Sequence, residues 1–308
     1  GLGGATFPSH VKLNPKEDIH TCIFNGAECE PLLMADAALM VNQGDQLIKG
    51  CKLVLKAVGA NEGIIAIEDD KQEAIEVMKE LCKDIPTLSV IEVPSVYPQG
   101  STEMLFKTIT GKEEPPDGST RDLGYLVINV ATTVAVSEAI DPGIPLSYRI
   151  CSVVGDVMQQ KNVYFPIGTS IQDMIDFCGG FDGTPSKIIT GGFMMGKTVD
   201  TLAASLTKSA NGLIVINEKH DQDSTPSPCI LCARCVEVCP VGLLPHQLEK
   251  NYLKKNWKRL EKLYVESCIN CGCCTYICPA RRHLAEHIVA GQQALKRGGN
   301  RNGEKIGI

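Results

Sequence analysis

The residues best suited to chemistry in this chain are cysteines crowded near its end. Nine of the fifteen cysteines lie between residues 229 and 278, and eight of them form two copies of the run C-x2-C-x2-C-x3-C, each followed by proline. Three thiols at this spacing can wrap three corners of a cubane cluster, while the fourth reaches the neighbouring cluster. The spacing therefore predicts two [4Fe-4S] clusters with crosswise ligands. One is assigned Cys229, Cys232, Cys235 and Cys278, and the other Cys268, Cys271, Cys274 and Cys239.

The main alternative for these cysteines is structural zinc, which CxxC pairs also bind. Zinc closes with four ligands, however, and eight cysteines in this repeat with both prolines fit iron–sulfur clusters better. Cys273 is a ninth cysteine, but only its neighbour Cys274 keeps both spacings, so we expect Cys273 to be a packed thiol. Crowding at fixed spacing indicates metal and a reducing compartment. Two linked clusters indicate one-electron transfer.

A chain that passes single electrons needs a flavin if its donor is a two-electron carrier such as NADH. The opening GLGGATFPSHVK places three glycines ahead of Lys12, and glycines let backbone N–H groups approach phosphate oxygens. The turn NGAECEP, residues 25–31, offers an amide and two carboxylates after a short apolar run. Taken alone, the first pattern is also a common loop and the second a solvated turn.

An α/β fold is needed to position these residues. Residues 20–140 alternate between strand and helix patterns. Strands are predicted at 21–24, 63–67, 88–93 and 125–130, and helices at 35–58, at 71–83 and from about 132. Repeated units of this kind predict a largely parallel sheet, and such sheets bind ligands beyond the carboxyl ends of their strands. The NGAECEP turn lies at that edge.

A second, β-rich module is predicted after the first. Its strands are expected at 148–154, 163–165 and 187–190, with a short helix at 170–178 capped by Ser170. The linker KHDQDSTPSP then leads to the cysteine-rich part, where a basic helix at 248–265 would separate the two cysteine runs. Its basic face is either solvated or docks an acidic partner. We therefore predict domains at 1–146, 147–218 and 219–296, and a tail at 297–308.

Composition excludes two broad classes of function. The net charge of -6 gives no electrostatic footprint for nucleic acid. No stretch reaches the roughly 20 apolar residues that a membrane-spanning helix requires. A role at a membrane would therefore be that of a peripheral subunit.

The combination of motifs resembles the flavin subunit of respiratory complex I and, more closely, the C subunit of the Rnf complex, a ferredoxin:NAD+ oxidoreductase. GLGGATFP, NGAECEP, the YPQG of residues 97–100 and the doubled CxxCxxCxxxCP match the Rnf protein together. The resemblance implies a Rossmann-like FMN/NADH domain, a β-grasp-like (SLBB) domain and a helical ferredoxin-like domain with two clusters. The family carries a longer segment before GLGGATFP, so we expect the numbered chain to be a fragment.

The resemblance further implies that FMN and NADH share one cleft. Its implied residues are Gly3, Gly4 and Lys12 on the phosphate side, Phe7 stacked on a nucleotide ring, Asn25, Glu28 and Glu30 facing flavin or nicotinamide, and Tyr97, Gly100, Asn129 and Thr132 around the flavin. Implied partners are the membrane and iron–sulfur subunits of an Rnf-type complex and, indirectly, ferredoxin. The implied location is the cytoplasmic face of the membrane.

The sequence also departs from the complex I pattern. Ala27 replaces an acidic residue, Glu103 stands in a Gly-Ser-Thr-Glu stretch instead of Gly-Glu-Glu, and Ile128 replaces an asparagine. These departures change three positions of the complex I pattern. Three alternatives therefore stay open: a related electron-transfer protein feeding a soluble reductase such as clostridial proline reductase, a cluster adaptor without flavin, and a zinc-stabilised interaction module.

Overall fold

The strand–helix alternation of the first 140 residues forms a parallel sheet in the computed structural model, which describes residues 1–2, 6–115, 118–221 and 225–299. The strands run in the order β3-β2-β1-β4. Phe24 lies opposite Ile65 on one side and Ile128 on the other, both in parallel register. The predicted parallel sheet is therefore confirmed. Its strands are β1 (Thr21–Gly26), β2 (Glu62–Glu68), β3 (Leu88–Val93) and β4 (Tyr125–Asn129).

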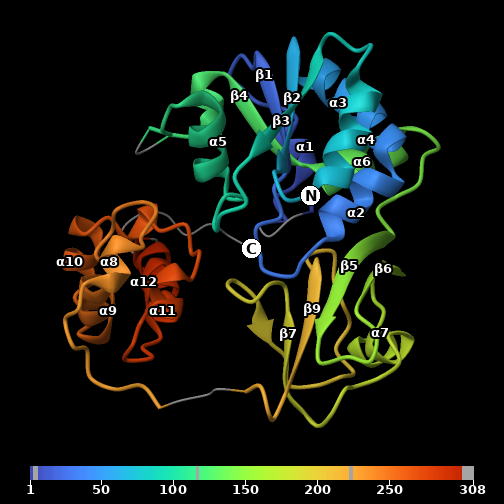
Figure 1. The fold of residues 1–308 in the computed structure, drawn as a ribbon. Helices are drawn as coiled ribbons and strands as arrows, with labels where there is room; N and C mark the ends of the chain where they lie inside the picture. The colour runs from blue at the N-terminus through green and yellow to red at the C-terminus, as the bar shows by residue number, and fades with distance from the viewer. Residues whose placement is uncertain (3–5, 116–117, 222–224, 300–308) are drawn as a thin grey trace, which may run out of the picture. The chain divides into compact units, whose positions relative to one another are not determined.

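Helices cover both faces of this sheet (Figure 1). Successive side chains of a strand point to opposite faces, so Cys22 and Phe24 pack against one group of helices and Ile23 against the other. Leu105 and Phe106 of α5 cover Ile23, while α2, α3, α4 and α6 pack on the opposite face. The helices are α1 (Ser9–Lys12), α2 (Ala35–Asn42), α3 (Gly44–Val58), α4 (Gln72–Cys82), α5 (Thr102–Thr110), the 3-10 helix η1 (Thr120–Leu123) and α6 (Val130–Ile140).

One predicted helix is divided in the structure. Residues 35–58 form α2 and α3 instead of one helix, because Gln43 leaves the helical conformation with φ -129° and ψ 31°. Glycine at 44 lets α3 begin against Leu81, where a Cβ atom would lie only 2.5 Å from Cδ1 of that leucine. Gly44 at the start of α3 therefore packs closely against Leu81 of α4.

The second module is a five-stranded sheet in the order β6-β5-β9-β7-β8. Its central strands β5 and β9 are parallel, and β6 and β7 run antiparallel to them. Ser170 caps the helix by accepting a hydrogen bond from the Asp173 N–H at 3.0 Å, as predicted. The elements are β5 (Tyr148–Gly155), β6 (Lys161–Pro166), α7 (Ile171–Phe177), β7 (Pro185–Thr190), β8 (Lys197–Thr198) and β9 (Gly212–Asn217).

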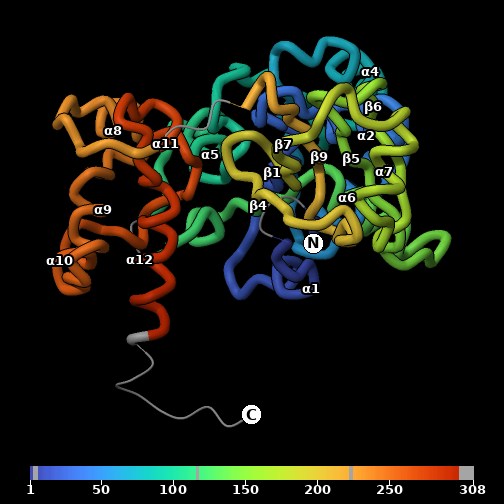
Figure 2. The backbone as a smooth tube through the Cα atoms, turned by 90° about the horizontal axis from the view of Figure 1, so that it is seen from below, coloured from blue at the N-terminus to red at the C-terminus, as the bar shows by residue number. Residues whose placement is uncertain are grey.

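The chain divides into two compact units, residues 1–221 and 222–308, and the second is helical. Its two long helices, α9 and α12, pack side by side (Figure 2). The elements are α8 (Arg234–Glu237), α9 (Pro245–Leu253), α10 (Trp257–Lys262), the 3-10 helix η2 (Val265–Ser267), α11 (Cys273–Tyr276) and α12 (Leu284–Gly299). Across the described ranges, every helix is too short or too polar to cross a bilayer.

The predicted helix at 248–265 is wrong as a single element. The chain leaves α9 after Leu253, and Lys255 adopts a left-handed conformation with φ 53°. Asn256 then caps α10 by accepting a hydrogen bond from the Arg259 N–H at 3.2 Å. A capping asparagine within a run of helix-forming residues marks a new helix start.

Candidate functional site

The two cysteine runs adopt the same backbone shape. Between the ligand cysteines, Leu231 and Ala233 in the first run and Asn270 and Gly272 in the second are left-handed. Such residues turn successive N–H groups toward the inside of a loop, where they can face an anionic group. For Leu231 and Ala233 this conformation is strained, and such strain is concentrated at functional sites.

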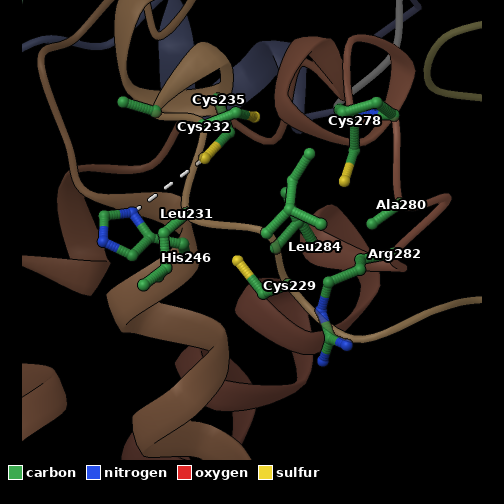
Figure 3. A pocket seen from close by; sticks show the side chains of 12 residues that line it. Cys229, Leu231, Cys232, Cys235, His246, Cys278, Ala280, Arg282 and Leu284 are labelled. Carbon is green, nitrogen blue, oxygen red and sulfur yellow. Dashed lines mark hydrogen bonds between the residues drawn. The ribbon is translucent and has the colours of Figure 1, made fainter.

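The first pocket of the helical unit is lined by the cysteines assigned to one cluster (Figure 3). Cys229, Cys232 and Cys235 come from the first run, and Cys278 comes from the end of the second. His246 lies at the edge, with its Nδ1 4.0 Å from Cys235 Sγ. The other side chains that line the pocket are mainly apolar, apart from Arg282. This is a suitable lining for four thiolates around a cluster.

The second pocket has the reciprocal composition. Cys268, Cys271 and Cys274 of the second run line it together with Cys239 of the first. Cys273, expected to be a packed thiol, lines the same pocket. The backbone N–H groups of Leu243 and Asn270 donate to the sulfurs of Cys239 and Cys268 at 3.3 and 3.4 Å. Donors of this kind stabilise thiolates bound to iron.

Burial makes these thiols poor thiolates without metal. It raises the pKa of Cys268 to about 11 and that of Cys274 to about 12. Within the described residues, no three His, Cys, Asp or Glu side chains are grouped as ligands of a single ion. The lining of each pocket by four of the assigned cysteines fits the number of thiolates that one cubane needs.

Asn25 and the YPQG loop join at the carboxyl edge of the parallel sheet. Asn25 Nδ2 donates to the Gly100 carbonyl at 2.9 Å, and its Oδ1 accepts from the Ala27 N–H at 3.0 Å. The Gly100 N–H points at Cys29 Sγ, 3.2 Å away. A Cβ atom on Gly100 would lie 2.4 Å from the Ala27 carbonyl oxygen, so only glycine fits here. The amide of Asn25 therefore fixes the two loops against each other.

The end of β4 meets the same edge. Asn129 caps α6 by accepting hydrogen bonds from the N–H groups of Ala131 and Thr132. Its Nδ2 donates to Asp36 Oδ2 at 2.6 Å. Thr132 Oγ1 accepts from the Leu2 N–H at 2.9 Å, which ties the opening segment to α6. The structure thus brings Asn25, Gly100, Asn129 and Thr132 to one edge.

A buried group of charges underlies this edge. Glu28 Oε2 accepts a hydrogen bond from the Asp36 N–H at 2.8 Å. The positive charge of Arg149 in β5 attracts the carboxylates of both Glu28 and Asp36. Burial raises the pKa of Glu28 well above its usual value, and the Asp36 carboxylate adds to that rise. Burial likewise raises the pKa of Asp36, and Arg149 opposes the rise. Asp36 was not predicted as a site residue, because an acid in the first turn of a helix has an ordinary structural role.

Glu30 points toward the second sheet. Its Oε2 accepts from the Met194 N–H and its Oε1 from the Met195 N–H, both at 2.9 Å. Burial raises the pKa of Glu30, and the two N–H donors oppose that rise. The carboxylate therefore joins the NGAECEP turn to the loop between β7 and β8.

The other residues predicted to bind flavin or nucleotide differ in how far they are buried. Gly3 and Gly4 lie outside the described residues. Phe7 is exposed, which leaves its ring open to stacking, and Tyr97 is half-buried in the YPQG loop. Burial lowers the pKa of Lys12, and the nearby Arg121 lowers it further. A partly desolvated cation beside a second cation suits a phosphate ligand.

Three buried polar atoms on the loops at or next to this edge lack a hydrogen-bond partner within the described part of the chain. They are Glu28 Oε1, Glu68 Oε1 and Gln99 Nε2. FMN carries ring and ribityl donors and acceptors that can complete such groups, so the residues present fit a flavin. Sequence reasoning missed Glu68 and Gln99. Glu68 could have been found, since it ends the apolar strand GIIAIE at the ligand edge.

Glu68 predicts a distinct pH dependence of stability. The residue is 1% exposed, and burial raises its pKa from the usual 4.5 to about 7. Between about pH 4.5 and about pH 7, the folded protein therefore keeps a proton on Glu68 that the unfolded protein has lost. The free energy of unfolding falls progressively as pH rises through this range, because the buried carboxyl group loses its proton at a cost in the folded state. Glu68→Gln should raise the melting temperature of FMN-free protein by several degrees at pH 8 and by little at pH 4.5.

Thermal unfolding monitored by circular dichroism measures this difference. Glu76→Gln, on the exposed face of α4, is the matched control and should change neither value. Equal gains for Glu68→Gln at both pH values would contradict the assignment of the buried proton to Glu68.

Family models match all three parts of the chain. Residues 1–138 match the Nuo51 FMN-binding domain, residues 150–198 the SLBB domain, and residues 217–281 the 4Fe-4S dicluster domain. The predicted fold class, with FMN-binding, β-grasp-like and two-cluster domains, is confirmed. The chain thus carries domains for FMN and for two 4Fe-4S clusters.

The fold is shared with a solved structure. An NAD+-reducing [NiFe]-hydrogenase in the air-oxidized state superposes with a TM-score of 0.64 at 20% identity, covering 96% of this chain and 59% of that one. At this identity the likeness concerns the fold alone.

Relatives of higher identity are subunits of redox complexes. The C subunit of the proton-translocating ferredoxin:NAD(+) oxidoreductase complex of Clostridium ljungdahlii is 41% identical over 251 residues, covering 80% of this chain and 55% of the relative. The C subunit of the Na(+)-translocating complex of Acetobacterium woodii is 38% identical, covering 85% of this chain and 60% of the relative. The chain thus spans somewhat over half the length of these relatives. By sequence, it is homologous to the C subunits of ion-translocating ferredoxin:NAD(+) oxidoreductase complexes, as its motifs predicted.

Proposed function

We propose that this chain is the NADH-handling electron-transfer subunit of an Rnf-type ferredoxin:NAD+ oxidoreductase. The observation that carries the proposal is the presence of an FMN-binding domain and a 4Fe-4S dicluster domain in one chain. Bound FMN would exchange a hydride with nicotinamide and single electrons with clusters. The domain boundaries at 146, 218 and 296 remain part of this proposal.

The residues at the sheet edge would bind and orient. Lys12 and the glycine loop would neutralise phosphate, and Phe7 would stack on a nucleotide ring. Asn25 and Asn129 hold the loops and the start of α6 in place, and Gly100 keeps the backbone near the flavin free of a side chain. Hydride transfer depends on such orientation and requires no general acid or base.

In the helical unit, eight cysteines would hold the clusters in the crosswise arrangement predicted from their spacing. Cys278 would be the fourth ligand of the cluster that Cys229 helps to bind. Cys239 would be the fourth ligand of the cluster that Cys268 helps to bind. The apolar lining of both pockets would limit water around the clusters and so influence their reduction potentials.

The proposed setting is a complex at the membrane. The related C subunits belong to ion-translocating complexes. We place this chain peripherally on the cytoplasmic face, in contact with membrane and iron–sulfur subunits and, through them, with ferredoxin.

An anaerobic assay with the purified protein tests the proposal. NADH should bleach the flavin absorbance and support reduction of a one-electron acceptor. Protein that contains FMN but shows neither response would exclude nucleotide oxidation and leave a cluster adaptor. Protein without flavin but with both clusters would favour the same alternative.

Lys12→Ala should weaken FMN or NADH binding about tenfold and leave the iron content unchanged. The variant removes a partly buried ammonium group from the phosphate side of the site, and the clusters lie in the other compact unit. Flavin fluorescence titration of the apoprotein and an NADH saturation curve measure the two affinities. Lys16→Ala, an exposed lysine of the same segment, is the control. Normal affinity for both ligands would remove Lys12 from the site.

A further inference from the structure

The two cysteine-lined pockets of the helical unit differ in charge. The first is lined by Arg282 and His246 in addition to its four cysteines (Figure 3). Among the described residues, the lining of the second pocket contains no arginine, lysine, histidine, aspartate or glutamate. Both pockets are formed by the same spacing of cysteines and by the same left-handed turns. Charge therefore distinguishes two pockets that are built alike.

Two hydrogen bonds hold Arg282 at the first pocket. Its Nε donates to Glu249 Oε2 at 2.6 Å, and its Nη1 donates to the Ser227 carbonyl at 3.2 Å. The Ser227 N–H donates in turn to the Ala280 carbonyl at 3.0 Å. These contacts join the chain just ahead of the first cysteine run to the chain just after the second. The guanidinium group is thus fixed where the two runs meet.

Glu249 anchors the guanidinium group from outside the pocket. The residue is 3% exposed, and its Oε1 lies 3.0 Å from His287 Nδ1. Arg282 lines the first pocket, whereas Glu249 does not. A buried carboxylate without a cation is costly, so Glu249 keeps Arg282 in place. The cation consequently faces the pocket, and its counter-ion lies farther from the cysteines.

The positive charge of Arg282 acts on cysteines of the first pocket. The hydrogen bond to Glu249 raises the pKa of Arg282, and the charges of Cys229 and Cys278 add to that rise. A cluster bound by four thiolates is an anion, and its negative charge grows when it takes up an electron. A fixed cation nearby therefore stabilises the reduced form more than the oxidised form.

We propose that Arg282 raises the reduction potential of the cluster in the first pocket, and that Glu249 is a positioning residue which holds the guanidinium group there. The inference rests on the proposed function, in which both clusters carry electrons. Transfer of one electron from the second cluster to the first oxidises the second and reduces the first, while no bond or proton changes. Arg282 makes this transfer more favourable, toward the pocket whose Cys229 and Cys232 are exposed.

A redox titration of the protein with both clusters, monitored by electron paramagnetic resonance, tests the proposal. At a fixed solution potential, Arg282→Gln should lower the ratio of reduced to oxidised first cluster about tenfold, which is about 59 mV for a one-electron carrier. The ratio for the second cluster should not change. Cys278→Ala and Cys239→Ala identify which signal belongs to which cluster.

Arg281→Gln is the matched control. Arg281 is exposed, precedes Arg282 in the chain and does not line the pocket. Its replacement removes the same charge and should leave both ratios within twofold of the wild-type values. Arg282→Lys keeps the positive charge and should restore most of the wild-type ratio. A purely structural role for the guanidinium group would not give that rescue.

A double variant, Arg282→Gln with Glu249→Gln, avoids leaving a buried carboxylate without its cation. The first cluster should still be harder to reduce than in the wild type, because the cation lies nearer to it than the anion does. An iron content of about eight per chain shows that a variant retains both clusters. Where Arg282→Gln does not retain them, the double variant provides the comparison.

An unchanged ratio for the first cluster in these variants, or an equal fall in Arg281→Gln, would overturn the role of Arg282 and leave the proposed function intact. Wild-type protein that holds no iron–sulfur cluster would overturn both.

Discussion

Replacing Cys278 with alanine should abolish the cluster held by Cys229, Cys232 and Cys235, and should spare the cluster held by the cysteines nearer to it in sequence. The structure explains this expectation, because Cys278 lines the pocket of the first cysteine run. Cys239→Ala should have the reciprocal effect, since Cys239 lines the pocket of the second run. Each variant should retain about four of the eight iron atoms expected for two cubanes.

Double variants separate crosswise from sequential ligation. Electron paramagnetic resonance of the reduced protein distinguishes the two clusters by their signals. Under crosswise ligation, Cys278→Ala and Cys229→Ala remove the same signal, and their combination removes no more than either alone. Cys278→Ala combined with Cys239→Ala should remove both signals. Cys273→Ala is the control and should retain both. If Cys278→Ala and Cys268→Ala remove one common signal, the crosswise assignment is wrong.

Arg149→Met should destabilise the first unit by about 3 kcal/mol at pH 8, in the range for breaking a buried charge group. Arg149 is 4% exposed, and its Nε donates to the Ala210 carbonyl at 2.9 Å. Removing the guanidinium leaves that carbonyl without its donor. It also leaves the carboxylates of Glu28 and Asp36 without the cation that opposes the rise in their pKa values.

The loss of stability caused by Arg149→Met should be smaller at pH 5 than at pH 8. Burial already raises the pKa values of Glu28 and Asp36, and loss of the cation raises them further. Protonation at lower pH then removes the uncompensated charge at little cost. Urea unfolding at the two pH values measures the difference. Lys49→Met, on the exposed face of α3, is the control. A loss that is the same at both pH values would show that Arg149 acts through packing alone.

Local patterns were sufficient for the elements of the first sheet but not for long-range breaks and pairings. Strong apolar runs such as residues 63–67 predicted their strands, and repetition predicted a parallel sheet. The break at Gln43 interrupts an apolar pattern that continues on both sides of it, so the local pattern predicted one helix. The strand β9 at the centre of the second sheet was not among the predicted strands. It pairs with β5 and β7, whose residues lie more than 20 positions away in sequence, and a local pattern does not record such pairing.

The candidate site shows the same division. Spacing alone predicted which cysteines lie near one another, because a cluster restricts its ligands strongly. The edge rule for parallel sheets placed Asn25 at the ligand edge, and only the family resemblance added Asn129, which donates to the Asn25 carbonyl there. The contact of Glu30 with a loop 164 residues away could not be predicted, since it depends on how the second sheet packs against the first. The same is true of Arg149 beneath Glu28 and Asp36.

Electron transfer from a flavin to two clusters is tested most directly by the content of iron, acid-labile sulfide and FMN in the purified chain after anaerobic reconstitution. We expect about eight iron, about eight sulfide and about one FMN per chain, because two cubanes and one flavin are required to connect a two-electron donor to one-electron carriers. A colourless protein that binds zinc without sulfide, or a protein with both clusters that binds no FMN, would contradict this expectation.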